Sequence, residues 1–165
     1  MKTKIVFVMH ELNLGGAERV ITNIINNFNK DLYDVHLCLF KKKGELVKEI
    51  NHEVKIHDLK AKRVLSSSLK YFMLLLDLKP NIVFSGITHV NFLTSLLIPF
   101  LRLKTKIIFI SREVNNPSIR SNYKLKSKIM DFFYRFSINN YDNIIAQSNY
   151  MKNDIFNYYN VNKNK

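Results

Sequence analysis

The sequence predicts a doubly wound α/β domain, in which helices cover both faces of a parallel β-sheet. Three observations lead to this fold class. Short, continuous apolar runs recur along the chain, as is typical of strands buried on both faces. Segments with the apolar spacing of one helix face lie between these runs. The 165 residues, 47% of them hydrophobic, suffice for the core of a single domain.

The first half of the chain alternates between the two patterns. KIVFVM (4–9) is a short run rich in β-branched residues and predicts a buried strand. From Ala17 to Phe28, apolar residues return every three or four positions, which predicts an amphipathic helix. The next elements are a strand VHLCLF (35–40), a short helix ELVKEI (45–50), a strand VKIHDL (54–59) and a serine-capped helix over 66–79, ended by Pro80.

The second half continues in the same order. NIVFS (81–85) predicts a strand that ends at Gly86, and a helix is expected over 90–103, kinked or shortened by Pro99. The remaining elements are a strand KIIFIS (106–111), a loop over 112–121, a long helix over 123–140, a strand NIIAQS (143–148) and a helix over 149–159. The polar end of the chain is expected to fray.

Composition excludes several classes of protein. Cys38 is the only cysteine, so no intramolecular disulfide can form, and its apolar surroundings predict a buried thiol in a reducing compartment. The apolar run Ile5 to Met9 is too short for a signal peptide, which favours a cytoplasmic chain. The most apolar stretch, 91–101, is too short to span a membrane. The five histidines show no spacing typical of a metal site.

The chain is strongly basic, with a net charge of +13. Between Arg102 and Lys128, eight basic residues face one acid, Glu113. Such a segment favours phosphates, anionic lipid or nucleic acid, although a general richness in lysine would give the same count. A basic nucleic-acid-binding α/β module is therefore an alternative function. Against it, no helix-turn-helix, zinc-finger or RNA-recognition motif is present.

Gly15 and Gly16 follow the first predicted strand and precede the first helix. In a doubly wound sheet this position lies at the carboxyl ends of the strands, where ligands bind. Two residues without a Cβ allow close approach to the backbone, and the helix N-terminus attracts anions. The alternative is that the pair serves only the turn. The pattern is neither the G-x-G-x-x-G dinucleotide fingerprint nor a P-loop.

Four stretches together resemble the N-terminal domain of family-4-like glycosyltransferases with the GT-B fold. They are LNLGGAERVITNI, LKPNIVFSGITHVNFL, ISREVNNPS and NIIAQSNYMKNDI, in the family's order and covering nearly the whole chain. The resemblance implies a Rossmann-like domain over 1–160 that holds the acceptor. It also implies that 161–165 are a tail or the start of a linker to a missing C-terminal domain, which would hold the nucleotide-sugar donor through a Glu-x7-Glu motif.

The resemblance further implies sugar transfer with retention and without a metal, and no cofactor other than the nucleotide-sugar co-substrate. The acceptor would be a glycan or a lipid-linked glycan in surface polysaccharide or glycoconjugate synthesis, handled by a cytoplasmic or peripheral membrane enzyme. Whether the chain is an isolated domain of a longer protein, the product of a truncated gene or one subunit of a split enzyme is left open. The fragment alone is expected to be inactive.

The candidate substrate-binding residues are Gly15, Gly16, His89, Arg112, Glu113 and Asn115. Many relatives carry a histidine that contacts the transferred sugar in the loop after strand five, where this chain reads Ser111-Arg112-Glu113. Arg112 could bind a phosphate of the acceptor or donor, and Glu113 could orient an acceptor hydroxyl. The alternatives are a surface ion pair for Arg112 and Glu113, a turn for Asn115, and a capping or partly buried histidine for His89. Ser148 is expected to cap the last helix. No catalytic residue is assigned.

The predicted helix over 123–140 combines apolar and basic residues. Leu125, Ile129, Phe132, Phe133 and Phe136 share one side, and lysines and an arginine supply charge. We expect Phe132 and Phe133 to pack in the core, and the basic cluster to contact an anionic membrane surface.

Overall fold

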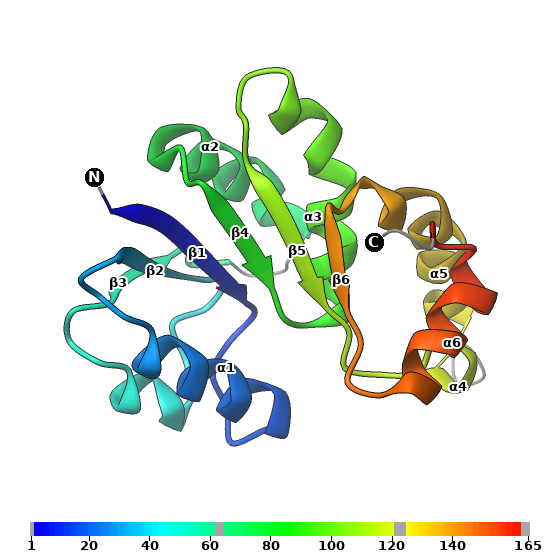
Figure 1. Ribbon diagram of the computed structural model, residues 1–165, viewed down its shortest axis with the longest axis horizontal. Helices are drawn as coiled ribbons and strands as arrows, with labels where there is room; N and C mark the ends of the chain where they lie inside the picture. Colours follow the sequence, from blue (N-terminus) through cyan, green and yellow to red (C-terminus); the bar gives the residue numbers. More distant parts are fainter. Residues whose placement is uncertain (1, 62–64, 121–124, 163–165) are drawn as a thin grey trace.

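The computed structural model describes residues 2–61, 65–120 and 125–162, without the side chains of residues 65, 120 and 125–127. These residues form a parallel six-stranded sheet in the order β3-β2-β1-β4-β5-β6 (Figure 1). The strands are Thr3–Met9 (β1), Tyr33–Leu39 (β2), Lys55–Asp58 (β3), Ile82–Ser85 (β4), Ile108–Arg112 (β5) and Asn143–Ile145 (β6). The predicted α/β fold class is confirmed.

The register of the central strands brings their carboxyl ends to one edge. Val8 of β1 pairs with Ser85 of β4, and Ser85 pairs in turn with Ser111 of β5. The chain segments that follow β1, β4 and β5 therefore leave the sheet side by side. This is the arrangement that the candidate site requires.

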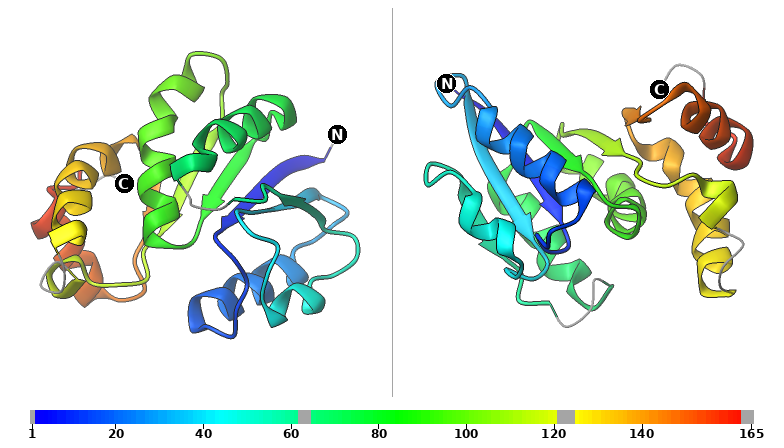
Figure 2. Two further views of the ribbon diagram at one scale, coloured as in Figure 1. Left: turned by 180° about the vertical axis from the view of Figure 1, so that it is seen from behind. Right: turned by 90° about the horizontal axis from the view of Figure 1, so that it is seen from below.

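Helices cover both faces of the sheet (Figure 2). Helix α1 and the 3₁₀ turn η1 pack on one face, against Phe7 and Met9 of β1. The other face is buried by α2, α3, α5 and α6, against Val6, Val8 and Val83. The bounds are Gly16–Asn27 (α1), Glu45–Glu49 (η1), Leu65–Ser67 (η2), Ser68–Leu78 (α2), Thr88–Arg102 (α3), Pro117–Arg120 (α4), Leu125–Ser137 (α5), Ile138–Asn140 (η3) and Asn149–Tyr159 (α6).

Helix α3 passes through Pro99 and ends only at Arg102. A proline lacks the N–H that would bond to the carbonyl four residues earlier, here that of Ser95. The side chain of Asn140 fills this role, because its Nδ2 donates to the Ser95 carbonyl oxygen at 3.0 Å. The helix therefore continues past Pro99. Shortening at this proline, which was one of the two expected outcomes, does not occur.

Two local features differ from the expected ones, and one expected helix cap is present. No side-chain hydrogen bond caps α2, although Ser67 occupies the N-cap position, so the serine cap expected there is not formed. In the loop predicted over 112–121, residues Pro117–Arg120 form the single turn α4. The expected cap of α6 is confirmed, since Ser148 Oγ accepts from the Met151 N–H at 3.1 Å.

The expectation that Phe132 and Phe133 pack in the core is wrong. Their side chains on α5 are 60% and 53% exposed, while Asp131 and Tyr134 of the same helix are buried. Periodicity correctly marks one apolar side of this helix, but that side faces outward. In the basic segment, Arg102 is paired with Asp142 at 2.6 Å, and the side chains of Arg120, Lys124 and Lys126 lie outside the described residues.

At the end of the described chain, Val161 is buried in the core, and the Asn162 N–H donates to Asn139 Oδ1 at 3.0 Å. The remainder of the predicted tail, 163–165, lies outside the described residues. Cys38 is buried in β2, and burial raises the pKa of its thiol.

Candidate functional site

Backbone hydrogen bonds join the segment between β1 and α1 to the chain that follows β2. The Leu12 N–H donates to the Lys43 carbonyl at 2.9 Å, and the Leu46 N–H donates to the Leu12 carbonyl at 3.1 Å. Gly44 allows this close approach with a φ of 108°, a conformation that favours glycine. The two loops therefore support each other at the carboxyl edge of the sheet.

Gly15 and Gly16 lie where β1 leads into α1. Gly15 is the N-cap residue of α1, and Gly16 begins the helix and is exposed. A Cβ on Gly15 would meet the carboxylate of Glu18, whereas a Cβ on Gly16 would meet nothing within 4 Å. The packing of this chain therefore does not require glycine at position 16, which leaves space beside the exposed N–H groups of the helix.

His10 and His89 bring the ends of β1 and β4 together. The two rings meet edge to face, with centroids 5.1 Å apart and planes at 82°. His89 lies in the first turn of α3 and is partly buried. Burial and the neighbouring His10 lower the pKa of His89 to about 4, against the opposing effect of Glu11. His89 is therefore neutral near pH 7 and can both donate and accept a hydrogen bond.

Arg112 ends β5 and is only 8% exposed. Its Nη1 atom is buried without a hydrogen-bond partner among the described residues, and burial lowers the pKa of the guanidinium. Three further buried atoms, on the first turns of α3 and at the end of β5, also lack a partner among the described residues: Thr88 Oγ1, Asn91 Oδ1 and Ser111 Oγ. Buried polar atoms are nearly always hydrogen-bonded, so four exceptions where α3 begins and β5 ends mark this place as a binding-site candidate.

Glu113 is almost completely buried and takes part in an internal network. Its Oε1 accepts from Asn91 Nδ2 at 2.8 Å and from Tyr134 Oη at 2.6 Å. Asn91 Nδ2 also donates to the Arg112 carbonyl at 3.0 Å. Neither Arg112 nor Glu113 lies on the surface, so the alternative of a surface ion pair does not apply. The network fixes the backbone from which the Arg112 side chain projects.

The structure thus gathers most of the predicted residues at one edge of the sheet. Gly15, Gly16, His89 and Arg112 follow or end the adjacent strands β1, β4 and β5. Asn115 is exposed in the loop beyond β5. A cavity of about 500 Å³ lies farther along, between β6 and α6, and none of the six predicted residues lines it.

Thr88, Asn91 and Ser111 were not among the predicted site residues. Asn91 carries two hydrogen bonds that position the end of β5, and it is completely buried. The sequence held one signal for it, because an asparagine on the apolar face of a predicted helix requires partners. Which atoms would supply them depends on strand order, which the sequence alone does not give.

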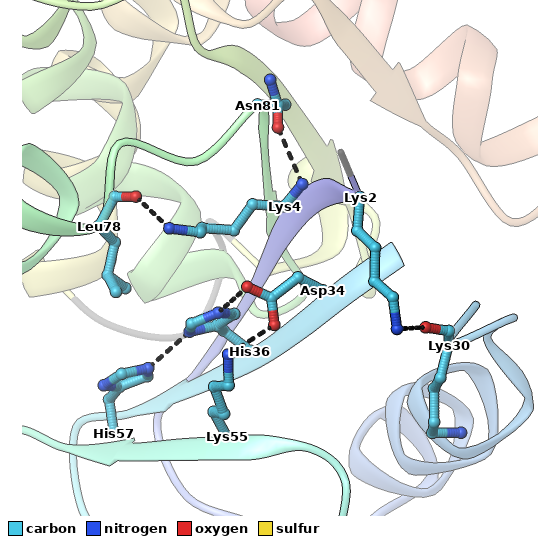
Figure 3. A network of polar contacts seen from close by, with 9 residues as sticks. All are labelled: Lys2, Lys4, Lys30, Asp34, His36, Lys55, His57, Leu78 and Asn81. Atoms are coloured by element: carbon cyan, nitrogen blue, oxygen red, sulfur yellow. Dashed lines mark hydrogen bonds and ion pairs between the residues drawn. The ribbon is translucent and has the colours of Figure 1, made fainter. Parts of the chain in front are cut away.

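A second polar cluster lies at the opposite, amino edge of the sheet (Figure 3). It borders an open cavity of about 640 Å³ lined by several lysines. Lys4 Nζ donates to the Leu78 carbonyl at the end of α2, and Lys30 Nζ donates to the Asn26 carbonyl in α1, both at 2.8 Å. These lysines stabilise the negative ends of helices. We therefore assign them a structural role.

Within the same cluster, His36 and His57 stack with their planes nearly parallel, and His36 Nδ1 lies 2.8 Å from His57 Nε2. Asp34 Oδ2 approaches His36 Nε2 at 3.1 Å, close enough for an ion pair although not in hydrogen-bond geometry. Partial burial would raise the pKa of Asp34, but contacts with Lys55 and His36 outweigh it and hold the pKa at about 2.

The described residues contain no group of three or more His, Cys, Asp or Glu side chains that could hold a metal ion. None of their helices is both long and apolar enough to cross a membrane.

Comparison with known proteins agrees with the fold. Residues 14–165 match the model of Glycosyltransferase Family 4. No match was found among curated proteins. In solved structures, the fold is similar to that of a glycosyltransferase from Rickettsia africae, with a TM-score of 0.69 and 16% identity over 99% of this chain and 41% of that one.

Two other structures share the fold. HepE of Anabaena, solved in complex with UDP and glucose, has a TM-score of 0.67 and 12% identity, covering 94% of this chain and 41% of that one. Sucrose-phosphate synthase from Thermosynechococcus elongatus has a TM-score of 0.70 and 7% identity, covering 94% and 45%. The chain therefore spans less than half the length of each of these proteins.

Proposed function

This chain belongs to glycosyltransferase family 4, and we propose that it is the acceptor-binding half of an enzyme that transfers sugar from a nucleotide-sugar. The acceptor is a glycan or lipid-linked glycan in surface polysaccharide or glycoconjugate synthesis. The donor is held mainly by a second domain. A second domain is supported by the lengths of the similar structures, because this chain matches less than half of each of them.

The observation that carries this proposal is the Nη1 atom of Arg112, which is buried and has no hydrogen-bond partner among the described residues. A guanidinium binds phosphate oxygens through directed N–H donors, and burial strengthens each such contact. Arg112 would therefore bind a phosphate of a lipid-linked acceptor.

The other candidate residues have roles that fit this placement. The N–H groups at Gly15 and Gly16 would bind phosphate oxygens, with the positive end of the α1 dipole behind them. His89, neutral near pH 7, would bond a sugar hydroxyl. Glu113 and Asn115 would orient an acceptor hydroxyl. Glu113 is itself held in place by the hydrogen bonds that it accepts from Asn91 and Tyr134.

The resemblance to the family supports transfer with retention and without a metal. The chain itself supplies positioning in this scheme, because it binds and orients the acceptor while the second domain presents the activated sugar. We expect residues 1–165 alone to transfer no sugar. Transfer by the purified chain from a nucleotide-sugar would show that this division into halves is wrong.

The acceptor subsite can be tested without knowing the sugar. Geranyl diphosphate carries the diphosphate and a short prenyl tail, and its binding can be followed by amide chemical shifts in two-dimensional NMR. We expect shifts at Gly15, Gly16 and Arg112, and a loss of about tenfold or more in affinity for Arg112→Ala.

Arg102→Ala is the matched control, because Arg102 lies at the far end of α3 and is paired on the surface with Asp142. It should bind geranyl diphosphate as the unaltered chain does. Shifts confined to the lysine-lined cavity at the amino edge, with equal effects of the two substitutions, would refute the proposed site.

A further inference from the structure

We propose that His36 and His57, here called the histidine pair, form a pH-sensitive switch that holds the edge strand β3 against β2 at neutral pH and releases it in acid. His36 lies on β2 and His57 on β3, and Nδ1 of His36 is 2.8 Å from Nε2 of His57 (Figure 3). The two rings are parallel, and His36 is only 3% exposed. The pair therefore joins the two strands through a buried side-chain contact in addition to their backbone hydrogen bonds.

Strand β3 has few other contacts that could hold it in place. It is four residues long, it is the outermost strand beside β2, and none of its four side chains is fully buried. Val54 and Leu59, on either side of the strand, are buried and anchor the chain there. Because short edge strands with little burial open at a low cost in free energy, release of β3 can occur without unfolding of the domain.

The positions of the protons in the histidine pair follow from its neighbours. Asp34 Oδ2 lies 3.1 Å from Nε2 of His36, which favours the tautomer of His36 that carries its proton on Nε2. Nδ1 of His36 then bears a lone pair and accepts a hydrogen bond from the Nε2–H of His57. In this arrangement Nδ1 of His57 is the ring nitrogen that takes up an added proton.

The charges around the pair oppose that added proton. Burial lowers the pKa of His57, and the neighbouring His36 lowers it further. The ammonium groups of Lys55, on the same strand, and of Lys4, on β1, act in the same direction. The Asp34 carboxylate lies against the far nitrogen of His36 and already accepts from Lys55 Nζ at 2.9 Å. A proton on the pair is therefore poorly compensated in the folded protein.

The remaining titratable groups of the surrounding elements contribute little to this balance. Cys38 on β2 and Tyr71 on α2 stay protonated, because burial raises the pKa of each. Asp58 on β3 accepts two backbone N–H groups through Oδ1. The charged side chains of α2, Lys70 and Asp77, are exposed to solvent. The two lysines and the carboxylate described above therefore dominate the charge at the pair.

A closed histidine pair holds fewer protons than an open one. If both rings were protonated, every ring nitrogen would carry a proton, and two N–H groups would face each other across 2.8 Å. The closed pair therefore takes up one added proton at most, whereas two separated histidines with a pKa of about 6.5 take up two. In acid, each proton of difference should favour the open state by up to about tenfold per pH unit.

Release of β3 would reach the candidate site through the loop that follows β2. Asp58, the last residue of β3, accepts from the Lys42 N–H through Oδ1 at 3.2 Å. The next residue, Lys43, accepts from the N–H of Leu12, in the segment that leads to Gly15. Acid should therefore loosen this segment, and its importance for acceptor binding rests on the proposed function. The switch itself does not depend on sugar transfer, so the two proposals can fail separately.

Backbone amide hydrogen exchange of the complete chain, followed by NMR between about pH 7.5 and about pH 5, tests the switch. Protection factors correct for the intrinsic pH dependence of exchange and report the population of opened molecules. We expect the protection of the amides between β2 and β3 to fall by about tenfold per pH unit in acid. It should stay below that of the central strand β4 at every pH, and the Leu12 amide should follow β3.

His57→Gln separates the hydrogen bond from the titration. The Gln Nε2 can donate to Nδ1 of His36, and its Oε1 can accept from a protonated His36, so the contact survives in acid. This variant should keep β3 protected at neutral pH and should lose the fall in protection. His52→Gln is the matched control, because His52 is an exposed histidine in the turn before β3. It should behave as the unaltered chain does.

His57→Phe tests the hydrogen bond alone. It keeps an aromatic ring but has no donor, so the protection of β3 should already be lower by about tenfold at neutral pH. His89→Asn serves as a second control, because it changes the pH dependence of global unfolding through a different histidine. The fall in protection at β3 should be the same in this variant as in the unaltered chain.

Three results would overturn the proposal. They are a protection of β3 that does not change with pH, an equal pH dependence in His57→Gln and His52→Gln, and a fall at β3 that disappears in His89→Asn. The last result would assign the effect to global unfolding. If β3 loses protection in acid while Leu12 does not, the switch stands and its link to the candidate site is refuted.

Discussion

The His89 ring rests edge to face against His10, at the point where the first turn of α3 meets the end of β1. This contact and burial together lower the pKa of His89 to about 4. A histidine in the unfolded chain has a pKa of about 6.5. His89 therefore binds a proton more readily in the unfolded chain than in the folded protein. As a result, the free energy of unfolding depends on pH.

The first prediction concerns this linkage. Between about pH 6.5 and pH 4 the unfolded state binds a proton at His89 that the folded state does not, so stability falls as the pH falls through this window. The loss should be about 2–3 kcal/mol. Urea unfolding at pH 7.5 and pH 4.5 measures it. His89→Asn should show a smaller difference between the two pH values, and an unchanged difference would contradict the assignment.

The second prediction separates two glycines. At Gly44, φ is 108° and a Cβ would collide with the Leu12 backbone, so Gly44→Ala should cost at least about 3 kcal/mol in the free energy of unfolding. Gly16→Ala should change stability little or raise it by up to about 1 kcal/mol, because the space beside it is open. The same variant should weaken geranyl diphosphate binding about tenfold.

The third prediction concerns the proline within α3. Asn140→Ala removes the donor to the Ser95 carbonyl and should cost about 1 kcal/mol, measured by thermal or urea unfolding. In a Pro99→Ala background, residue 99 can donate to that carbonyl itself, so removal of the Asn140 side chain should cost less. A double-mutant cycle with no coupling between the two positions would show that the compensation is absent.

The fourth prediction addresses the buried carboxylate. Tyr134→Phe removes a 2.6 Å hydrogen bond to Glu113 and leaves the carboxylate with one donor fewer, which should destabilise the protein by about 2–3 kcal/mol. Tyr150→Phe is the control, because Tyr150 is largely exposed and its loss should change stability by less than about 0.5 kcal/mol. Equal effects of the two substitutions would show that Tyr134 Oη contributes nothing.

Local pattern predicted much of this fold correctly. Short apolar runs such as KIVFVM became buried strands, and the spacing after Ala17 became α1. The gathering of Gly15, His89 and Arg112 at one edge also followed from sequence, because parallel strands joined by helices send their carboxyl ends the same way. These features follow from the hydrophobic periodicity of the sequence and from the right-handed connection between parallel strands. Neither requires knowledge of which distant residues are in contact.

The rest depends on contacts between distant residues. Periodicity marks Phe132 and Phe133 as one side of a helix but does not say whether that side meets the sheet or the solvent. The continuation of α3 past Pro99 depends on Asn140, which lies 45 residues away from the carbonyl that it serves. The unpaired Nη1 atom of Arg112 likewise becomes apparent only in the packed structure, where the side chain is buried.

Cys38 gives a convenient probe of how often the domain opens. It is the only thiol in the chain, it is fully buried in β2 beside the central strand, and burial raises its pKa. A maleimide or disulfide reagent can therefore modify the folded protein only after the middle of the sheet separates. The rate of labelling in native buffer measures the population of opened molecules, and it requires no engineered site.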